Sequence, residues 1–450
     1  MTNTISEREL VMGILLEVTR DGNYSHIALR NVLSKYQYLD KKQRSFITRV
    51  TEGTLEHLLE IDYIINQFSK IKVKKMKPVI QAIIRSGVYQ LKYMDNVPDS
   101  AVCNEAVKLT VKKGLGQLKG FVNGLLRNIA RKMDEVHYPD ENTVEGMSIR
   151  YSMPEWIIRQ WETTYDRATV GRMLADFLTE KPTVIRYQSH HMTKEEFLEK
   201  MRQEGVVIEE HPYLPYAFYL SGYDYLNALK SFEEGDFQVQ DISSMLVTEI
   251  AAPKEGDRVM DVCAAPGGKA LHMAERVGTT GLVEARDLTP YKVALLEENI
   301  QRAGLTNIKV KQQDATIYDQ ASKEKADILI ADLPCSGLGV LGKKTDLKYK
   351  MTADMQEELV QLQRKILSTI QEYVKVGGTL LYSTCTIHEE ENQGNVQWFL
   401  HHYPQYELAP IQDFLCKELK QEVNEDGCLQ LLPGIHKSDG FFIAKFRKVQ

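Results

Sequence analysis

Two cysteines of this chain stand where predicted strands end. Cys335 follows a proline in ILIADLPCSG (328–337), and Cys385 follows a threonine in YSTCTIHEEEN (382–392). The branched apolar residues before Cys335 are typical of a buried strand that opens onto the surface. A thiol in that place can serve as a nucleophile, half of a disulfide, a metal ligand or a packing residue.

The composition of the chain disfavours a disulfide or a metal-binding role for these two cysteines. Six cysteines are few for 450 residues, no CxxC pair occurs, and the opening MTNTISEREL lacks the basic-then-apolar pattern of a signal peptide. We therefore expect reduced thiols and a cytoplasmic protein. No histidine pair lies near either cysteine, so no metal is expected. No apolar run approaches the roughly 18 residues that span a bilayer, so no membrane partner is expected.

Acidic residues close four successive predicted strands. The first strand leads into the small-residue loop DVCAAPGGKA (261–270), and Asp287, Asp314 and Asp332 close the next three. Small residues let a ligand approach the backbone, and the helix that follows offers free N–H groups. NAD binding could explain the loop alone. The series of acids is more specific, because Asp287 stands roughly 20 residues after the loop, the usual distance to a ribose-binding carboxylate.

The elements that must position these groups alternate regularly along the C-terminal half. The expected strands cover residues 257–264, 281–287, 308–314, 326–333 and 377–385. The expected helices cover residues 267–277, 290–304 and 355–374. Continuous apolar strands between amphipathic helices favour an α/β fold with a doubly wound parallel sheet. Such sheets bind ligands at the carboxyl ends of their strands, where all the groups above are expected.

The N-terminal part is basic and is predicted to be helical. Apolar residues recur at helical spacing over residues 10–20, 38–68 and 79–94, with no convincing strand. Residues 1–140 contain 22 Lys and Arg against 15 Asp and Glu, a balance of +7 in a chain whose net charge is −6. The lysines of KIKVKKMK (70–77) are either a solvated helix face or a patch that contacts phosphates.

A connector and a small mixed module follow. Residues 133–181 are polar and turn-rich around a helical stretch that places Trp156 and Trp161 near one face, and core packing is expected for both. Residues 182–222 then alternate strand, helix and strands, which indicates a small α+β module. The tyrosines of this module could stack unpaired bases.

Three motifs, DVCAAPGGKA, DLPCSGLGVL and YSTCTIHEEEN, together resemble the RNA cytosine-5 methyltransferase family. The order of the whole chain is similar to the RsmB/Sun (Fmu) branch, which methylates small-subunit ribosomal RNA, and VPDSAVCNEAVKL (97–109) resembles a NusB-type RNA-binding domain. The resemblance implies a multidomain protein with three parts. These are a NusB-like all-α bundle at residues 1–140, linker helices and a small α+β RNA-contacting module at 141–235, and a class I, Rossmann-like α/β methyltransferase domain at 236–450.

The resemblance also implies the reaction. S-adenosylmethionine would donate a methyl group to carbon 5 of a cytosine in 16S ribosomal RNA, with cytosine 967 as the expected target. Carbon 5 is a poor nucleophile, so a thiolate first adds to carbon 6, and a base later removes the carbon-5 proton. The family pattern implies Cys385 as the nucleophile and Cys335 as the group that assists product release. The substrate is either free RNA or a partly assembled small subunit, and a monomer is expected.

The cofactor site implied by the resemblance consists of the small-residue loop and the strand-end acids. Its residues are Cys263, Ala264, Ala265, Pro266, Gly267, Gly268, Lys269, Asp287, Asp314 and Asp332. Two of these residues have more than one expected role. Asp332 contacts either the cytosine edge or the cofactor alone, and Lys269 either faces the target base or caps its own strand end.

The remaining cysteines and one basic segment have subordinate roles in this interpretation. Cys103, Cys416 and Cys428 are predicted to be structural. The segment LGKKTDLKYK (341–350) keeps positive charge where the family carries basic residues, but its glycine and threonine depart from the common pattern. We expect this departure to affect the positioning of the substrate and not the reaction.

Two other functions stay open at this point. In an amino-group methylase, DLPC would be a variant of the (D/N)PP(Y/F) motif, although that motif needs an aromatic residue where Cys335 stands and leaves Cys385 unexplained. In a non-catalytic RNA-binding or assembly factor, the NusB-like part would bind RNA and the methyltransferase part would only dock. The retention of every expected catalytic residue speaks against that function.

Overall fold

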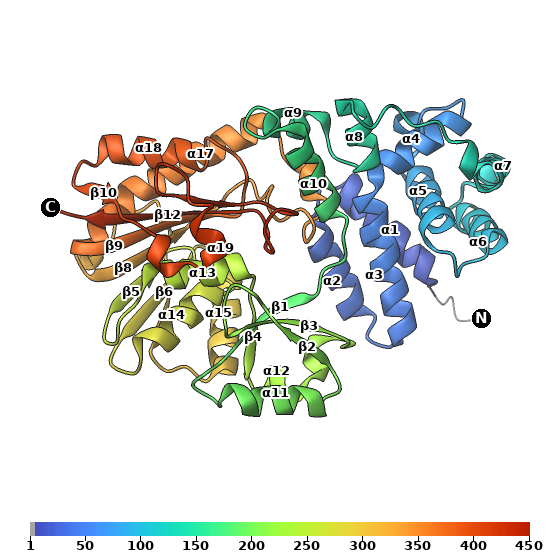
Figure 1. Ribbon diagram of the computed structural model, residues 1–450. Coiled ribbons are helices and arrows are strands. Elements are labelled where there is room, and N and C mark those ends of the chain that lie inside the picture. Colours follow the sequence, from blue (N-terminus) through green and yellow to red (C-terminus); the bar gives the residue numbers. More distant parts are fainter. Residues whose placement is uncertain (1–4) are drawn as a thin grey trace. The chain divides into compact units, whose positions relative to one another are not determined.

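The computed structural model describes residues 5–450, which form two compact units. The first unit contains the described residues up to Leu178 together with the segment Leu341–Met351. The second unit contains Thr179–Val340 and Thr352–Gln450, and Figure 1 traces the path of the chain in colour. Across residues 5–450, no helix combines the length and the apolar character needed to cross a membrane.

The first unit is built from helices, which were predicted for residues 1–140. It also takes in the segment 341–351, which was predicted to belong to the catalytic domain. The helices are α1 (Glu7–Thr19), α2 (Ser25–Lys35), α3 (Lys41–Glu56), α4 (Leu58–Phe68), α5 (Pro78–Tyr93), α6 (Asp99–Lys112), α7 (Lys119–Arg131), α8 (Val144–Arg150), α9 (Glu155–Trp161), α10 (Arg167–Phe177) and α16 (Leu347–Lys350). The single helix expected over 38–68 is in fact α3 and α4, because His57 departs from helical geometry between them. Asp40 and Gln43 form a capping box that fixes the start of α3.

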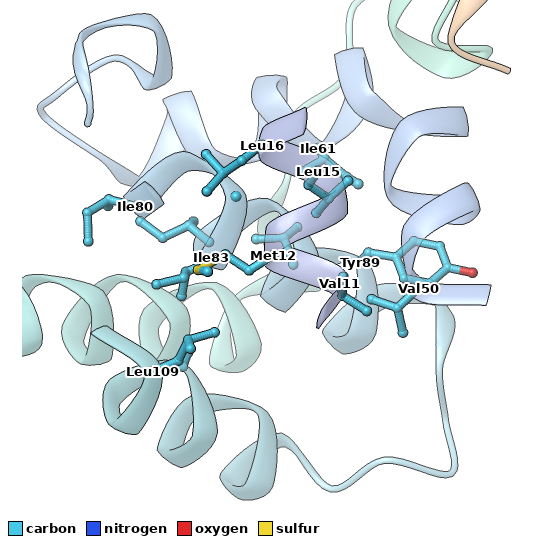
Figure 2. Packing of buried hydrophobic residues seen from close by; sticks show 14 of the residues in the cluster. Val11, Met12, Leu15, Leu16, Val50, Ile61, Ile80, Ile83, Tyr89 and Leu109 are labelled. Atoms are coloured by element: carbon cyan, nitrogen blue, oxygen red, sulfur yellow. The ribbon is translucent and has the colours of Figure 1, made fainter. Parts of the chain in front are cut away.

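Apolar side chains at helical spacing form the core of this unit. Val11 and Leu15 lie one turn apart on α1 and are fully buried or nearly so. Figure 2 shows them in one cluster with Ile61 of α4 and with Ile83 and Tyr89 of α5. Each such side chain contributes roughly 1.5–3 kcal/mol through burial. The basic N-terminal part therefore has a core of its own.

The segment Leu341–Met351 packs within the helical unit through buried polar contacts. Asp346 accepts hydrogen bonds from the backbone N–H of Ser25 (3.1 Å) and from its hydroxyl (2.6 Å). The buried ammonium of Lys348 donates to the carbonyl oxygen of Glu56 (3.0 Å). Burial lowers the pKa of Lys348 to about 7, since it disfavours the charged form.

The predicted small α+β module is present in the second unit. Its elements are β1 (Thr183–Tyr187), α11 (Lys194–Gln203), β2 (Val207–Glu210), β3 (Ala217–Ser221), α12 (Lys230–Glu233) and β4 (Phe237–Val239). The strands form an antiparallel sheet in the order β2-β3-β1-β4. Phe197 and Met201 of α11 pack on Ile185, Phe218 and Phe237 from the sheet. The module's sheet thus takes a strand from beyond residue 235.

The larger sheet contains the predicted parallel strands. They are β5 (Arg258–Asp261), β6 (Leu282–Asp287), β7 (Ile308–Gln312), β8 (Ala326–Asp332) and β9 (Val374–Thr384), and β10 (Tyr406–Leu408), β11 (Leu429–Leu431) and β12 (Phe441–Lys448) add an antiparallel edge. The order is β10-β12-β9-β8-β5-β6-β7, with β11 beside β12. The chain builds β5, β6 and β7 in one direction and then adds β8 and β9 on the other side of β5. Ligands bind such sheets at this reversal.

Helices cover both faces of this sheet, as Figure 1 shows. They are α13 (Ile242–Ala251), α14 (Gly268–Val277), α15 (Pro290–Ala303), α17 (Ala353–Ile370), α18 (Gln393–His402) and α19 (Lys417–Lys420). Alternate strand residues face opposite sides, so Ile328 and Ile330 pack with α13 and α14, whereas Leu329 packs with α17 and α18. The helix expected over 355–374 ends at Ile370, because Val374 already begins β9.

Gly53 of α3 provides a test of the core in the helical unit. A Cβ atom at Gly53 would overlap the ring of Tyr89. We expect Gly53→Ala to lower the free energy of unfolding by about 1–3 kcal/mol, because the ring must move within a packed core. Gly13 of α1 is the matched control, since a Cβ atom there meets nothing within 4 Å, and Gly13→Ala should raise stability by about 0.5–1 kcal/mol. Urea unfolding of the full-length variants measures both effects; equal midpoints would contradict the packing.

Candidate active site

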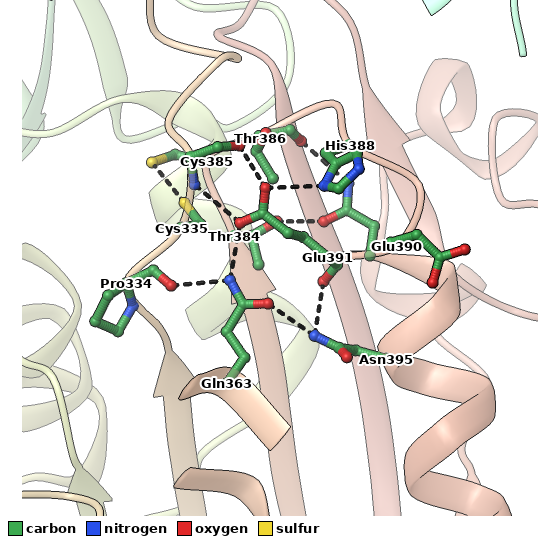
Figure 3. Close-up of polar contacts among 12 residues, drawn as sticks. Pro334, Cys335, Gln363, Thr384, Cys385, Thr386, His388, Glu390, Glu391 and Asn395 are labelled. Carbon is green, nitrogen blue, oxygen red and sulfur yellow. Dashed lines mark hydrogen bonds and ion pairs between the residues drawn. The ribbon is translucent and has the colours of Figure 1, made fainter. Parts of the chain in front are cut away.

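The two predicted thiols lie side by side at the ends of neighbouring strands. β8 and β9 pair in parallel, with Asp332 opposite Ser383, so their carboxyl ends reach the same edge of the sheet. Cys335 follows β8 by three residues, and Cys385 follows β9 directly. Their sulfur atoms are 3.3 Å apart. Figure 3 shows the two side chains turned toward each other. The structure therefore brings together the two cysteines that the sequence singled out.

The surroundings of the two thiols distinguish them. The hydrogen bond with Cys385 raises the pKa of Cys335 well above its usual range, and burial and the charges of Glu391 and Asp332 act in the same direction. The raised pKa keeps Cys335 protonated at neutral pH, and either thiol can donate the hydrogen bond between the two sulfur atoms. A protonated Cys335 can stabilise a thiolate beside it by donating its S–H.

A buried carboxylate ties the two thiol-bearing loops together. Glu391 has no exposed surface, and its Oε2 accepts hydrogen bonds from Ser336 N (2.9 Å) and Gln363 Nε2 (2.9 Å). Its Oε1 accepts from the hydroxyl of Ser336 and lies 3.1 Å from His388 Nδ1. Gln363 also donates to the carbonyl of Pro334 (2.8 Å), which fixes the Pro-Cys loop from both sides (Figure 3).

Glu391 is a site residue that the sequence reasoning missed. It is the third of three consecutive glutamates, of which Glu389 and Glu390 are exposed and Glu391 alone is buried. Asn392 beside it is also buried and accepts a hydrogen bond from the Thr384 hydroxyl (2.5 Å). The three glutamates precede α18 in a turn, where no periodicity indicates which side chain points inward. The only available signal was the position of all three within the Thr-Cys motif.

Asp332 and Lys269 form an ion pair beside the thiols. Lys269 Nζ donates to Asp332 Oδ2 (2.7 Å), and the hydroxyl of Ser383 donates to Asp332 Oδ1 (2.9 Å). The ammonium also lies over the Phe441 ring, 5.1 Å from its centroid. Lys269 thus joins the start of α14 to the end of β8. Its ammonium group contacts a residue of β8 and not the end of β5, the strand that precedes Lys269 in the sequence. A carboxylate has about four lone-pair sites, so Asp332 retains capacity for a ligand.

Asp287 is placed to organise the small-residue loop. Its Oδ2 accepts the backbone N–H of Ala265 (3.1 Å), and its Oδ1 accepts that of Leu288 (2.8 Å). Lys292 Nζ also approaches Oδ1, at 3.1 Å. The carboxylate is 3% exposed, so its remaining lone pairs face the loop and not bulk solvent.

The loop itself lets a ligand come close to the backbone. Ala264 donates its N–H to the carbonyl of Arg286 (2.8 Å), which holds the loop against β6. Gly267 has φ +112°, a conformation that favours glycine, and Gly268 begins α14. Cys263 is half-buried in the same loop, and burial raises the pKa of its thiol. Cys263, Ala264, Ala265, Pro266, Gly267 and Gly268 all lie at the carboxyl edge of the sheet.

Two further acids lie at the same edge. Asp314 was predicted to close β7, but it stands two residues past the end of that strand. It accepts hydrogen bonds from Thr316 N and Oγ1 (both 2.8 Å), and these bonds lower the pKa of Asp314. Asp261 ends β5 and was not among the predicted site residues. Burial raises the pKa of Asp261 to about 7, although Lys269 opposes the shift. Asp261 is the first residue of the small-residue loop, and that position could have indicated that it belongs to the site.

The donor and acceptor chemistry of this edge fits S-adenosylmethionine. The carboxylates of Asp287, Asp314 and Asp332 are acceptors, and the ribose hydroxyls, adenine amino group and ammonium group of that molecule are donors. The N–H groups at the start of α14 can receive its carboxylate. Within residues 5–450, no cluster of His, Cys, Asp and Glu is arranged to hold a metal ion.

The other predicted residues belong to other parts of the chain. The lysines of residues 70–77 are exposed, whereas Val73 and Met76 between them are buried, so this stretch is a solvated basic surface. Trp161 is buried in the core as predicted, but Trp156 is only half-buried. The remaining cysteines lie in or against the hydrophobic cores: Cys103, Cys416 and Cys428.

Comparison with known proteins identifies each part of the chain. Residues 248–447 match the 16S rRNA methyltransferase RsmB/F family, residues 5–131 the NusB family, and residues 153–224 the ferredoxin-like domain of RsmF/B-like methyltransferases. The match at 153–224 covers β1, α11, β2 and β3 of the small α+β module and ends before α12 and β4. The helical bundle and the parallel sheet therefore correspond to separately known families.

Relatives also match over the full length. The probable ribosomal RNA small subunit methyltransferase B of Bacillus subtilis (strain 168) is 33% identical, over 98% of this chain and 99% of its own. The protein of the same name from Synechocystis sp. is 32% identical over 99% and 100% of the two chains. The crystal structure of PH0851 covers 98% of both chains with a TM-score of 0.82 at 25% identity. This chain belongs to the RsmB/F family of 16S rRNA methyltransferases.

Proposed function

We propose that this chain transfers a methyl group from S-adenosylmethionine to carbon 5 of a cytosine in 16S ribosomal RNA, with cytosine 967 as the target, through a covalent bond between Cys385 and carbon 6. The observation that carries the proposal is the contact of two thiols, 3.3 Å apart, at the edge that bears the strand-end acids. One thiol suffices to form an adduct. The second gives the product-release step a proton carrier.

In the first half of the reaction the thiolate of Cys385 adds to carbon 6, which makes carbon 5 nucleophilic. Cys335 stabilises that thiolate beforehand by donating its S–H. Asp332, oriented by Lys269 and Ser383, is the carboxylate that we place at the N3/N4 edge of the cytosine. S-adenosylmethionine, held by the loop 263–269 and by the strand-end acids, supplies the methyl group.

In the second half the carbon-5 proton must leave and the bond from Cys385 to carbon 6 must break. The main cause of the raised pKa of Cys335 is its hydrogen bond with Cys385. That hydrogen bond weakens once the sulfur of Cys385 is bonded to carbon, so Cys335 can then give up its own proton to water, which is the net proton that the reaction releases. The Cys335 thiolate then accepts the carbon-5 proton. The electrons of the C–H bond restore the ring double bond, and Cys385 departs as a thiolate.

The target base must be unpaired or flipped out of its stack to reach the two thiols. We assign the remaining RNA contacts to residues 1–140 and 141–235, and catalysis to 236–450. The exposed lysines at 70–77 support phosphate contacts by the first of these parts. We extend the proposal to a monomer that acts in the cytoplasm, where cysteines stay reduced, on free RNA or on a partly assembled small subunit.

The other two functions explain the site less well. An amino-group methylase has no use for two thiols in contact, and it needs an aromatic residue where Cys335 stands. A factor that only binds RNA has no use for the buried network in which Glu391 and Gln363 fix the Pro-Cys loop. Neither function accounts for the positions of Cys335 and Cys385 at the ends of adjacent strands.

Replacement of the nucleophile should abolish turnover. We expect Cys385→Ala to lose about 10⁴-fold or more of the methylation rate, because no other group can form the adduct. The measurement is incorporation of label from S-adenosylmethionine into deproteinised small-subunit ribosomal RNA. Cys416→Ala is the matched control, since that half-buried thiol lies in another part of the second unit, and it should keep full activity. Full activity of Cys385→Ala would rule out its role as nucleophile.

Replacement of the second thiol should trap the intermediate. We expect Cys335→Ala to form the adduct but to release product slowly, because the carbon-5 proton has lost its acceptor. A labelled protein–RNA species should then appear on a denaturing gel for Cys335→Ala and be absent for Cys335→Ala/Cys385→Ala. If Cys335→Ala instead methylates RNA at the normal rate and forms no protein–RNA adduct, Cys335 has no role in product release.

Removal of the β6 carboxylate should weaken cofactor binding selectively. We expect Asp287→Ala to raise the Kd for S-adenosylmethionine by about 10- to 100-fold, because a buried carboxylate loses its hydrogen bonds to the ligand and to the loop. Asp257→Ala is the control, since Asp257 precedes β5 at the opposite edge of the sheet. Calorimetry gives the cofactor affinity and filter binding the RNA affinity. An unchanged cofactor affinity in Asp287→Ala would refute the assignment.

A further inference from the structure

A pocket of about 280 Å³ lies between the small module and α14 in the second unit. Arg186 of β1 and Tyr216, which precedes β3, line it from the module. His272 and Glu275 line it from α14. None of the thiols or strand-end acids of the candidate active site is among its lining residues. The volume is just below the usual range for small-molecule sites, so it suits a single small group.

Three side chains that line this pocket each have a buried polar atom with no hydrogen-bond partner among the described residues. The atoms are Arg186 Nη2, His272 Nδ1 and Glu275 Oε1. The side chains themselves are held firmly, because Arg186 Nη1 donates to Glu275 Oε2 (2.6 Å) and Arg186 Nε donates to Gln240 Oε1 (2.8 Å). Arg186 and His272 are each 1% exposed. Buried polar groups are nearly always paired, so these three atoms need partners that the protein itself does not supply.

The three atoms specify what that ligand must offer. Arg186 Nη2 needs an acceptor and Glu275 Oε1 needs a donor. Burial and the charges of Arg186 and Arg276 hold the pKa of His272 well below its usual range, so its neutral ring can donate or accept. A phosphate group offers only acceptors and would be repelled by Glu275. The edge of a nucleobase offers donors and acceptors side by side.

The rim of the pocket has the chemistry that a nucleotide would need outside the base. Lys194 and Arg276 line it with side chains that are 27% and 43% exposed. The ring of Tyr216 lies beside His272, with a centroid distance of 5.4 Å, and adds an aromatic surface. Aromatic rings and basic rims are the common elements of single-strand recognition.

We propose that this pocket holds one unpaired nucleotide of the RNA substrate, other than the target cytosine, with its base against Arg186, His272 and Glu275 and its phosphate near Lys194 and Arg276. The inference rests on the proposed function in so far as that function makes RNA the substrate. It adds a second point of attachment that would set the position of the RNA relative to the catalytic domain.

The pocket also adjoins the start of the helix that follows the cofactor loop. Gln240, which accepts from Arg186, lies against Gly268, where a Cβ atom would be 3.5 Å from Gln240 Cγ. His272 is four residues further along α14, which corresponds to about 6 Å. A bound base and the cofactor loop would therefore contact the same turn of α14.

Filling the pocket tests the proposal without removing a buried charge. Ser189 lies at the exposed rim, so Ser189→Trp should place its ring in the pocket while every ion pair is kept. Thr279→Trp is the matched control, because it adds the same ring to an exposed turn of the same unit. Arg186→Lys is a second test, since it keeps the charge beside Glu275 but removes Nη2. Melting temperatures show whether each variant is folded.

The measurement is the Kd of the full-length protein for a transcript of small-subunit ribosomal RNA and, separately, for S-adenosylmethionine. We expect Ser189→Trp and Arg186→Lys to raise the Kd for RNA by about 5- to 150-fold, the range for loss of one stacked base. The Kd for the cofactor should be unchanged, and Thr279→Trp should match wild type in both. Ultraviolet cross-linking of bound RNA should label the peptide that contains Tyr216.

Three results would overturn the inference. A folded Ser189→Trp variant with wild-type RNA affinity would mean that water alone occupies the pocket. A pocket that binds free nucleoside monophosphates, with RNA affinity independent of Ser189→Trp, would mean a separate nucleotide site. Wild-type protein that binds no RNA would contradict the inference together with the proposed function. If RNA affinity depends on the pocket but methylation survives Cys385→Ala, the pocket assignment stands and the catalytic proposal fails.

Discussion

Parallel pairing of β5, β6, β7, β8 and β9 is the constraint on which the site depends. Strands that run the same way end at the same edge, so acids and thiols far apart in sequence become neighbours. The register that places Asp332 opposite Ser383 also brings Cys335 within 3.3 Å of Cys385. A slip of one residue would turn each side chain to the other face of the sheet. Ile328 and Leu329 belong to separate cores on the two faces of the sheet.

Glu391 then converts proximity into a fixed geometry. A buried carboxylate is costly unless hydrogen bonds surround it, and here Ser336, Gln363 and His388 supply those bonds. Because Ser336 follows Cys335 and Glu391 belongs to the segment after Cys385, neither loop can move without leaving a buried charge unpaired. The hydrogen bonds around Glu391 thus hold the two sulfur atoms in place, and breaking these bonds would destabilise the protein.

Much of the sheet and of the candidate site could be predicted from the sequence, but contacts between distant elements could not. The parallel sheet and its strand-end residues followed from continuous apolar runs, and both thiols lie where those runs predicted. The pairing of Lys269 with Asp332 could not be predicted, because it requires β5 and β8 to be neighbours although β6 and β7 lie between them in sequence. The buried state of Glu391 depends in the same way on tertiary contacts, since its two glutamate neighbours look identical in the sequence.

The segment Leu341–Met351 has a consequence for how the chain is made. It belongs to the helical unit, yet it is encoded after β1 to β8 of the other unit. A protein folds from its N-terminus while it leaves the ribosome. The helical unit therefore cannot contact residues 341–351 until most of the second unit has been synthesised. During that interval Ser25 lacks the carboxylate of Asp346, and the Glu56 carbonyl lacks the ammonium of Lys348. The first part of the chain to be synthesised is therefore among the last to be completed.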